Sequence, residues 1–337
     1  MNEKQVLMQV KDLSVTYETR LGPVSAVDGI TFDIYRGEIL GLVGESGCGK
    51  STMGKALMRM IQPPGWISKG QLIFEGEDIM TYDRNKMRDF RGRKVSMIFQ
   101  DPMTSLNPVQ RVDQHLIEAI QVHEPKTIIE KALERANILM ERLGIQKERM
   151  SNYPHQLSGG MRQRVMIGLG LVLNANLIIA DEATTSLDVI VEAKLVDQLK
   201  EIRDEFGVTL LVITHNIALV AELCDRVAVM YAGHIVELGP IEEIFDNPLH
   251  PYTKGLLLSV PNIKLDEREE LFKMAGEPPN LTHPPFGCRF HPRCPKATAI
   301  CEEKEPEFRE VTPGRFVKCW LVKDYQVKEM KKAEVIK

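Results

Sequence analysis

Three glycines, a lysine and a serine stand at the spacing of a phosphate-binding loop in residues 44–51, which read Gly44-Glu45-Ser46-Gly47-Cys48-Gly49-Lys50-Ser51. The glycines let the backbone curl so that its N–H groups point inward at phosphate oxygens. Lys50 would bring a positive charge to the β- and γ-phosphates, and Ser51 would bring a hydroxyl to Mg²⁺. An apolar run before the loop and a helix expected after it argue against a chance match in a glycine-rich turn. The loop, with Thr52 behind it, therefore predicts a site for a nucleoside triphosphate and Mg²⁺.

A second candidate site follows the apolar segment from Leu177 to Ala180, which ends in Asp181 and Glu182. Paired acids at a strand end are often only a solvated turn. On a chain that also has a triphosphate loop, the first acid can hold Mg²⁺ through water. The second acid can polarise the water that attacks the γ-phosphate. The pair therefore predicts hydrolysis of the bound nucleotide.

Residues Leu157 to Met161 read Leu-Ser-Gly-Gly-Met and precede a basic helical segment. A Ser-Gly-Gly start is first of all a good N-cap, and that role alone could explain it. It would also be a second anion-binding helix end, on a chain whose phosphate loop already precedes one. Two such ends for one ligand suggest that two subunits contribute to each nucleotide site.

Six cysteines are present, and four of them lie close together near the C-terminus: Cys288, Cys294, Cys301 and Cys319. A reducing compartment argues against disulfides, so metal binding is the competing explanation. Their spacings of five, six and seventeen intervening residues match neither the two-residue spacing of zinc ribbons nor a ferredoxin run. Four thiolates in a proline-rich tail could hold a tetrahedral Zn²⁺ or a cubane cluster, or could stay free. The residues alone leave these three interpretations open.

The composition is that of an ordinary soluble protein, with 43% hydrophobic and 27% charged residues among 337. Its 43 basic and 47 acidic side chains leave a net charge of −4, which argues against a nucleic-acid binder. No apolar run behind a basic start marks a signal peptide. The most apolar stretch, Ile167 to Ala180, is too short to span a bilayer. We therefore expect a soluble, intracellular protein that reaches a membrane only through a partner.

The apolar pattern predicts an α/β protein. Residues 6–43 predict several short antiparallel strands. Within them, the continuous apolar run from Glu38 to Val43 predicts a buried strand that enters the phosphate loop. Helical segments dominate residues 101–165, and Gly144 closes one of them. Further along, we expect buried strands at Leu177–Ala180 and Val208–Thr214, a helix at Leu187–Phe206 and a hairpin at Arg226–Leu238. From Asn247 on, prolines recur and periodicity is weak, so this tail should have little core of its own, and a metal centre would compensate.

Six motifs in the same order make the chain resemble the ATP-binding subunit of an ABC transporter. They are the phosphate loop, Gln100 in Ile-Phe-Gln-Asp-Pro, the Leu-Ser-Gly-Gly signature, the Asp181-Glu182 strand, Ser186-Leu187-Asp188, and His215 in Ile-Thr-His-Asn. The resemblance covers residues 6–240. It implies an ABC-type P-loop ATPase domain at 1–245, with an antiparallel β subdomain and a helical signature subdomain at about 101–165. Residues 246–337 would then form a small irregular C-terminal extension with the metal cluster.

The resemblance also implies roles for individual residues in ATP binding and hydrolysis. Tyr17 would stack on adenine, while residues 44–52 would hold the phosphates. The residues implied in catalysis are Gln100, Glu182 and His215, and those implied in binding Mg²⁺ are Ser51, Gln100 and Asp181. Groups that would reach the nucleotide of the opposite subunit, or cross to it, are Ser158, Gly159, Gly160, Met161 and Asp188.

Four positions depart from the commonest pattern of this family. Met161 stands where Gln is usual, Ala183 where Pro is usual, Asn216 where Asp is usual, and Cys48 where Ser is frequent. None of these changes removes a group with a direct chemical role, so we still expect an active ATPase.

Further segments resemble a narrower branch, the dipeptide, oligopeptide and nickel importers: residues 100–108, 153–164, 250–257 and 285–320. The resemblance implies an importer ATPase at the cytoplasmic face of the cell membrane that drives uptake of dipeptides or oligopeptides. Its partners would be a second, different ABC ATPase, two transmembrane permease subunits and an extracytoplasmic peptide-binding protein. The tail cysteines would hold a [4Fe–4S] cluster, with Zn²⁺ as the alternative.

Three other functions are weighed against this one. A nickel importer of the same branch has the same motifs. A soluble ABC ATPase of DNA repair or translation would have a long coiled-coil insertion or a second ABC unit, and neither is present. A non-enzymatic redox or sensory module is disfavoured by the intact Glu182 and His215.

Overall fold

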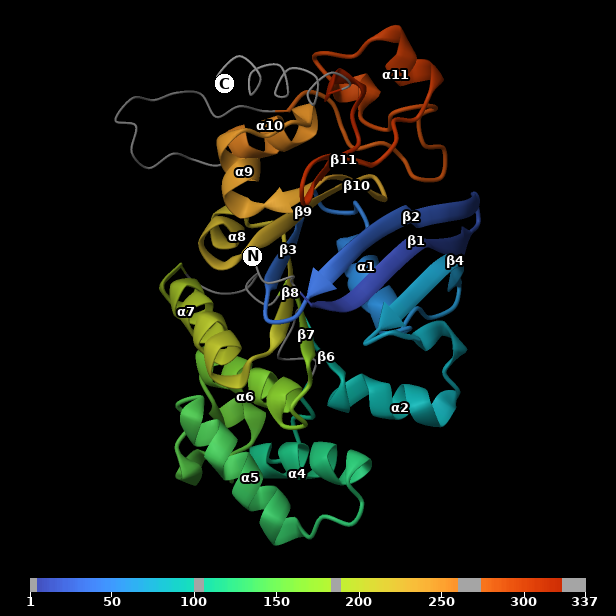
Figure 1. Cartoon of the computed structure of the whole chain (residues 1–337). Helices are drawn as coiled ribbons and strands as arrows, with labels where there is room; N and C mark the ends of the chain where they lie inside the picture. Colours follow the sequence, from blue (N-terminus) through green and yellow to red (C-terminus); the bar gives the residue numbers. More distant parts are fainter. Residues whose placement is uncertain (1–4, 100–105, 183–188, 260–273, 323–337) are drawn as a thin grey trace, which may run out of the picture. The chain divides into compact units, whose positions relative to one another are not determined.

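The computed structural model of the chain describes residues 5–99, 106–182, 189–259 and 274–322 (Figure 1). Gln100 and Asp188, two of the predicted site residues, lie outside these ranges. The backbone divides into two compact units. The first unit comprises Met1–Leu7, Tyr35–Ile39 and Phe74–Thr214, and the second comprises Met8–Ile34, Leu40–Ile73 and His215–Lys337.

Three parallel strands form the sheet of the first unit. They are β6 (Val95–Ile98), β7 (Leu177–Asp181) and β8 (Thr209–Thr214), with β7 in the middle. Every residue of β7 and β8 is buried, as is typical of strands covered on both faces. Because the carboxyl ends of parallel strands meet at one edge, the sheet places Asp181 and Glu182 at that edge.

Helices make up most of the remainder of the first unit. They are α2 (Arg84–Arg93), α4 (Val112–His123), α5 (Ile129–Arg142), α6 (Gly159–Leu171) and α7 (Val189–Phe206). The apolar residues of α5 recur at helical spacing and form its buried face, since Ala132, Ala136 and Met140 are fully buried. Helices α4, α5 and α6 pack against one another (Figure 1), and a positive φ of 72° at Gly144 ends the α5 segment. The short elements are β5 (Glu77–Asp78) and 3-10 turns at Ile79–Thr81, Lys147–Arg149 and Pro154–Gln156.

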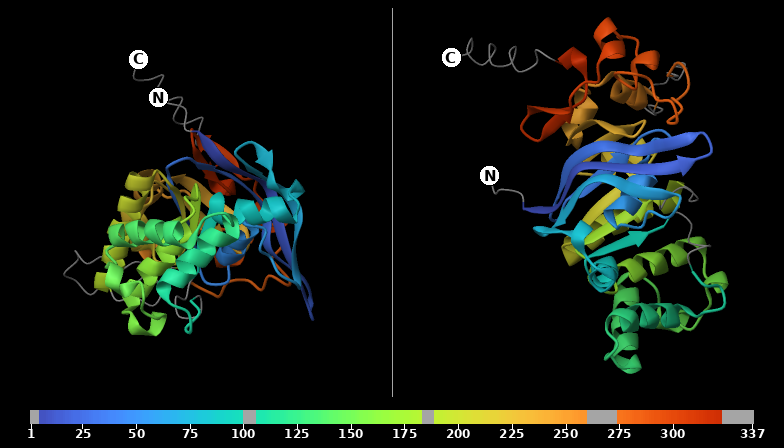
Figure 2. Two further views of the ribbon diagram at one scale, coloured as in Figure 1. Left: turned by 90° about the horizontal axis from the view of Figure 1, so that it is seen from below. Right: turned by 90° about the vertical axis from the view of Figure 1, so that its right-hand side faces the viewer.

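Two long strands replace the several short ones that the sequence predicted before the phosphate loop. β1 (Val6–Thr19) and β2 (Gly22–Tyr35) each have 14 residues, and they lie next to β4 (Gly65–Phe74) in the order β2-β1-β4 (Figure 2). Only Arg20 and Leu21 join β1 to β2, so these neighbours run antiparallel.

A further sheet of the second unit begins with β3 (Ile39–Val43), which is buried throughout and enters the phosphate loop as predicted. It pairs in parallel with β9 (Arg226–Tyr231). The predicted hairpin is confirmed, because β9 pairs antiparallel with β10 (His234–Pro240) around a turn at Ala232 and Gly233, both with positive φ.

The tail is more regular than the sequence predicted. Strands β11 (Arg309–Thr312) and β12 (Arg315–Val317) form a hairpin, and β12 pairs antiparallel with β10 (Figure 1). A small apolar cluster of Val311, Val317 and Val322 packs against Leu249 and Cys319. The tail therefore extends an existing sheet and has a small apolar cluster of its own.

The second unit also holds short helices: α1 (Lys50–Leu57), α8 (Ile217–Leu223), α9 (Ile241–Asp246), α10 (Pro251–Leu258) and α11 (Ala299–Glu303). Single 3-10 turns occur at His291–Arg293 and Trp320–Val322. Among the described residues, no helix has both the length and the apolar character needed to cross a membrane.

Candidate functional site

The phosphate loop connects β3 to α1, in the strand–loop–helix context that the sequence predicted. Gly44, Gly47 and Gly49 all have positive φ, at 156°, 78° and 108°. A Cβ at Gly44 would clash with the carbonyl oxygen of Met230, and one at Gly49 with that of Ala26. Glycine is therefore required at both positions by backbone conformation and by space.

Lys50 is the first residue of α1, and its side chain is folded back over the loop. Its ammonium donates to the carbonyl oxygens of Gly44 and Glu45, over 2.9 and 3.0 Å. Lys50 is only 4% exposed, so its charge is held among loop atoms with little contact with water. Cys48, beside it, is also buried, and burial raises the pKa of its thiol, which disfavours the reactive thiolate.

In the acidic pair of the first unit, Asp181 and Glu182, the second residue has an uncommon backbone conformation. Asp181, the last residue of β7, is buried at 5% exposure. Glu182 has a φ of 47°, and its N–H donates to the carbonyl oxygen of Ile213 at 2.8 Å. A left-handed conformation is uncommon for a residue other than glycine, and it is typical of positions held for function.

The signature segment starts helix α6. Ser158 is the N-cap, and its hydroxyl accepts a hydrogen bond from the N–H of Met161 at 3.3 Å. Ser158 and Gly159 are exposed, and Gly160 and Met161 are partly so. Ser158 therefore caps helix α6, and Gly159 and Gly160 remain wholly or partly accessible to solvent.

Three more predicted residues lie in the second unit. Tyr17 is half-buried in β1, with its ring so close to Gly65 that a Cβ there would clash with it. His215 is exposed directly after β8. Asn216 caps α8 by accepting from the N–H groups of Ala218 and Leu219, which explains why an amide can replace the usual acid there.

The metal prediction for the tail is not supported by the arrangement of its cysteines. All four lie among the described residues, and within that part of the chain no group of three or more His, Cys, Asp or Glu side chains could hold a metal ion. The thiols are nevertheless near one another. Burial, and then the charges of Cys288, Cys294 and Cys301, raise the pKa of Cys319 to about 11. The donor set suits a soft metal, but the geometry does not form a ligand shell.

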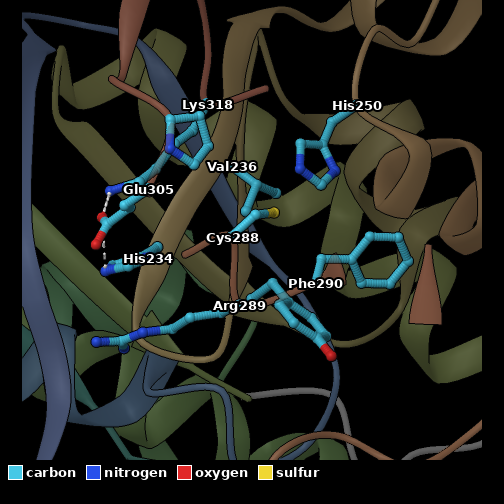
Figure 3. Close-up of a pocket in the computed structure, with 10 residues that line it drawn as sticks. His234, Val236, His250, Cys288, Arg289, Phe290, Glu305 and Lys318 are labelled. Atoms are coloured by element: carbon cyan, nitrogen blue, oxygen red, sulfur yellow. Dashed lines mark ion pairs between the residues drawn. The ribbon is translucent and has the colours of Figure 1, made fainter. Parts of the chain in front are cut away.

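A polar network, absent from the sequence-based predictions, joins the tail to β10, with buried His234 and Arg289 and exposed or half-exposed carboxylates of Glu305 and Asp28. Glu305 lies between the ammonium of Lys318 and the imidazole of His234, with a His234–Glu305 separation of 3.5 Å (Figure 3). Asp28 pairs with the guanidinium of Arg289. The cavity at this junction measures only about 10 Å³, which is room for a water molecule at most. The network therefore anchors the tail and is not a substrate site.

Sequence reasoning also missed the contacts between the tail and the phosphate loop. Arg293 forms two hydrogen bonds with the carboxylate of Glu45, at 2.7 and 3.0 Å. The hydroxyl of Tyr252 accepts from the N–H of Glu45 at 2.9 Å. The segment His250-Pro-Tyr252 was singled out as a motif, but nothing in the sequence connected Arg293 with a loop 248 residues away.

Acid should destabilise the second unit because two of its histidines are buried in the neutral form. Burial lowers the pKa of His250 to about 3 and that of His234 to about 4. The unfolded chain binds protons at these side chains below about pH 6.5, whereas the folded chain does not. We expect the free energy of unfolding to fall as the pH drops from about 6.5 toward 4, by up to about 1.4 kcal/mol per pH unit for each histidine.

Urea unfolding between about pH 7 and pH 5 measures this effect. His250 caps α10 by accepting from the N–H of Tyr252 at 3.0 Å, and asparagine can supply the same acceptor without titrating. His250→Asn should therefore reduce the pH dependence, whereas His155→Asn, at an exposed position, should leave it as in the wild type. An unchanged slope in His250→Asn would show that this histidine is not the source.

Two family descriptions match the sequence: residues 27–185 match "ABC transporter", and residues 236–301 match "Oligopeptide/dipeptide transporter, C-terminal region". The chain is 44% identical to the oligopeptide transport ATP-binding protein OppD of Bacillus subtilis (strain 168), over 94% of this chain and 89% of that protein. It is 43% identical to the dipeptide transport ATP-binding protein DppD of the same organism, over 94% of each.

Solved structures show the same fold. The structure of cbiO1 from Clostridium perfringens, part of the ABC transporter complex cbiONQ, superimposes with a TM-score of 0.63 at 28% identity. The alignment covers 72% of this chain and 92% of cbiO1.

Proposed function

Because this chain belongs to the ABC transporter family of ATPases and has the oligopeptide/dipeptide transporter C-terminal region, we propose that it powers uptake of dipeptides or oligopeptides by hydrolysing ATP. The observation that carries the proposal is the phosphate loop, in which Gly44 and Gly49 cannot be replaced and Lys50 is held over the loop. The names of the two relatives favour peptides over nickel as the transported class.

The proposed assembly follows from this role. The chain would bind at the cytoplasmic face of the membrane to two permease subunits, supplied by an extracytoplasmic peptide-binding protein. A second, different ABC ATPase would complete the pair. The boundary between an ATPase domain at 1–245 and an extension at 246–337 stays a prediction.

The proposed chemistry assigns a task to each group. Backbone N–H groups of residues 44–52 and the ammonium of Lys50 bind the phosphates, and Tyr17 stacks on adenine. Ser51, Gln100 and Asp181 would hold Mg²⁺, which offsets charge on the phosphates when it is bound. Glu182 accepts a proton from the attacking water, and His215 orients that water.

Gly159 supports a role for the signature in a second subunit's site. Among the described residues, no heavy atom lies within 4 Å of the Cβ that a substitution would add there, and its φ is not in the left-handed region. Neither backbone conformation nor packing within the chain therefore requires glycine. A ligand or partner that approaches Ser158, Gly159 and Gly160 closely would require it. We propose that this ligand is the γ-phosphate of ATP held by the opposite subunit, and that Met161 and Asp188 help to form that contact.

Gly159→Val is expected to lower ATP turnover by about 10²-fold, because a displacement of only 1 Å at a reacting group can cost that much. The melting temperature should stay near that of the wild type, since a Cβ at this exposed position has open space around it among the described residues. Steady-state hydrolysis and calorimetry measure the two quantities. Gly159→Ala, with its smaller side chain, should lie between the wild type and Gly159→Val, and equal turnover in all three would contradict the role.

Uptake of a labelled dipeptide by intact cells tests the transport proposal. Cells that lack this chain should lose uptake, and wild-type protein should restore it while Lys50→Ala should not. Uptake of radioactive nickel is measured in the same cells. Loss of nickel uptake with normal peptide uptake would reassign the substrate, and no loss of either would overturn the importer function.

We further propose that the tail cysteines bind a [4Fe–4S] cluster, with Zn²⁺ as the alternative. The support is the donor set itself, four thiols within one short segment, which favours soft metals. The thiols would have to close around the metal on binding, because the arrangement described here forms no ligand shell. Anaerobic purification followed by metal analysis tests it. About four irons per chain would support the cluster, one zinc would support the alternative, and neither metal would leave four free thiols.

A further inference from the structure

A short loop of the tail, residues 288–294, packs directly against the phosphate loop and β9. Its Phe290 is 2% exposed and lies in a group of aromatic rings, with centroids 5.2 Å from Tyr231 and 5.4 Å from Tyr252. Figure 3 shows Phe290, Arg289 and Cys288 at this junction. Arg289 on one side of Phe290 pairs with Asp28, and Arg293 on the other side reaches Glu45. We call residues 288–294 the tail loop.

Both the carboxylate and the backbone N–H of Glu45 form hydrogen bonds with side chains of the second unit. Its carboxylate takes both hydrogen bonds from the planar guanidinium of Arg293, and its N–H donates to Tyr252. The Arg293 side chain is only 5% exposed, and Glu45 is 25% exposed. Arg293 also donates to the hydroxyl of Tyr231 at 3.3 Å. The guanidinium is thus fixed, and its two bonds to Glu45 hold the pKa of Arg293 above its ordinary value.

The charge of Glu45 conflicts with the task of the loop in which it lies. Glu45 is the second residue of the phosphate loop, next to Gly44 and five positions before Lys50. A carboxylate there repels a triphosphate, and burial of its neighbourhood reduces the screening that water would supply. Arg293 removes this repulsion by pairing with it in a planar, two-bond geometry that lysine cannot copy.

We propose that Arg293 is a positioning residue for nucleotide binding: it neutralises Glu45 and fixes the first turn of the phosphate loop, so that the tail sets the affinity for ATP. This inference rests on the proposed ATPase function. It gives the C-terminal extension a task in the catalytic cycle that needs no metal. It also explains why an acidic residue is tolerated inside a loop that binds an anion.

Titration of the full-length protein with MgATP, together with steady-state hydrolysis, tests the proposal in four variants. Arg293→Gln should weaken ATP binding about tenfold, which corresponds to about 1.4 kcal/mol, with a rise in KM and a much smaller change in kcat. Arg293→Lys keeps the charge and should lose about threefold or less. In the double variant Glu45→Gln/Arg293→Gln, which like the wild type has no net charge at this pair, the affinity should return to within about twofold of the wild type, because no carboxylate remains to be neutralised.

Arg289→Gln is the matched control, since Arg289 is also a buried arginine of the tail loop but pairs with Asp28. It should lower the melting temperature, and any effect on ATP affinity should be the same in the wild-type and the Glu45→Gln backgrounds. Should Arg293→Gln prove too unstable to titrate, the double variant Glu45→Gln/Arg293→Gln keeps the proposal testable, because its affinity should agree with that of the wild type within about twofold. Glu45→Gln alone, in which the charge of Arg293 is uncompensated, should bind MgATP at least as tightly as either.

Affinity of Arg293→Gln within about twofold of the wild type would overturn the proposal. So would a double variant that binds as weakly as Arg293→Gln, because the loss of affinity would then not come from the uncompensated carboxylate of Glu45. Failure of the wild-type protein to bind MgATP would refute the ATPase function instead, so the two hypotheses fail in different experiments.

Discussion

ATP turnover by Glu182→Gln is expected to fall by about 10²- to 10⁴-fold, with MgATP binding retained, as for removal of a general base. Glutamine has the size of glutamate and keeps one acceptor oxygen, but it cannot take a proton from water. The Glu182 N–H donates to the carbonyl oxygen of Ile213, at the carboxyl edge of the sheet. The backbone position is therefore set independently of the side chain, and the substitution should change chemistry alone.

Backbone strain at Glu182 strengthens this expectation. A φ of 47° costs a residue with a Cβ on the order of 1 kcal/mol or more, which the fold tolerates at the end of β7. Single-turnover hydrolysis and ATP titration separate the chemical step from binding. Glu201→Gln, an exposed glutamate of α7, is the control and should hydrolyse ATP like the wild type. Wild-type turnover in Glu182→Gln would remove Glu182 from the catalytic set.

Elements with a strong local pattern were predictable from the sequence. The buried runs of β3, β7 and β8 and the apolar face of α5 need no distant partner to be recognised. The length of β1 and β2 was not predictable, because polar residues at their exposed positions resemble turn signals. The addition of β12 to β10 was missed for a different reason. Its pairing of Val317 with Glu237 joins segments far apart in the chain, and such contacts leave no local signal.

The features of the candidate site also fall into those that the sequence predicted and those that it could not predict. The spacing of Gly44, Gly47 and Gly49 identified the phosphate loop because the chemistry itself demands glycines there. The pairing of Glu45 with Arg293 could not be predicted, since either residue alone would be taken for a solvated charge. Cysteine content pointed to a metal, yet the positions of the thiols, all within the described residues, do not form a ligand shell. Residue type indicates what chemistry is possible, whereas geometry decides which groups can act together.

Arg315→Met is expected to lower the free energy of unfolding by about 3–5 kcal/mol, because it leaves a buried charge unpaired. Glu237 is fully buried, and its carboxylate accepts from the N–H groups of Leu249 and His250, at 2.8 and 2.9 Å. Arg315, whose side chain is 4% exposed, supplies the compensating charge at 3.1 Å. This pair joins β12 to β10, so its loss should also loosen the tail from the sheet.

Denaturant unfolding of Arg315→Met measures the loss, and Arg142→Met provides the control. Arg142 pairs with Glu205 at 3.2 Å, but both side chains are about half exposed, so breaking that pair should cost about 1 kcal/mol or less. Adding Glu237→Gln to Arg315→Met should recover part of the loss, because glutamine has no charge to compensate. The recovery should be incomplete, because its one amide oxygen can accept from only one of the N–H groups of Leu249 and His250. Equal losses in Arg315→Met and Arg142→Met would mean that water reaches Glu237. The tail would then be held to the sheet by its apolar contacts and strand pairing rather than by this ion pair.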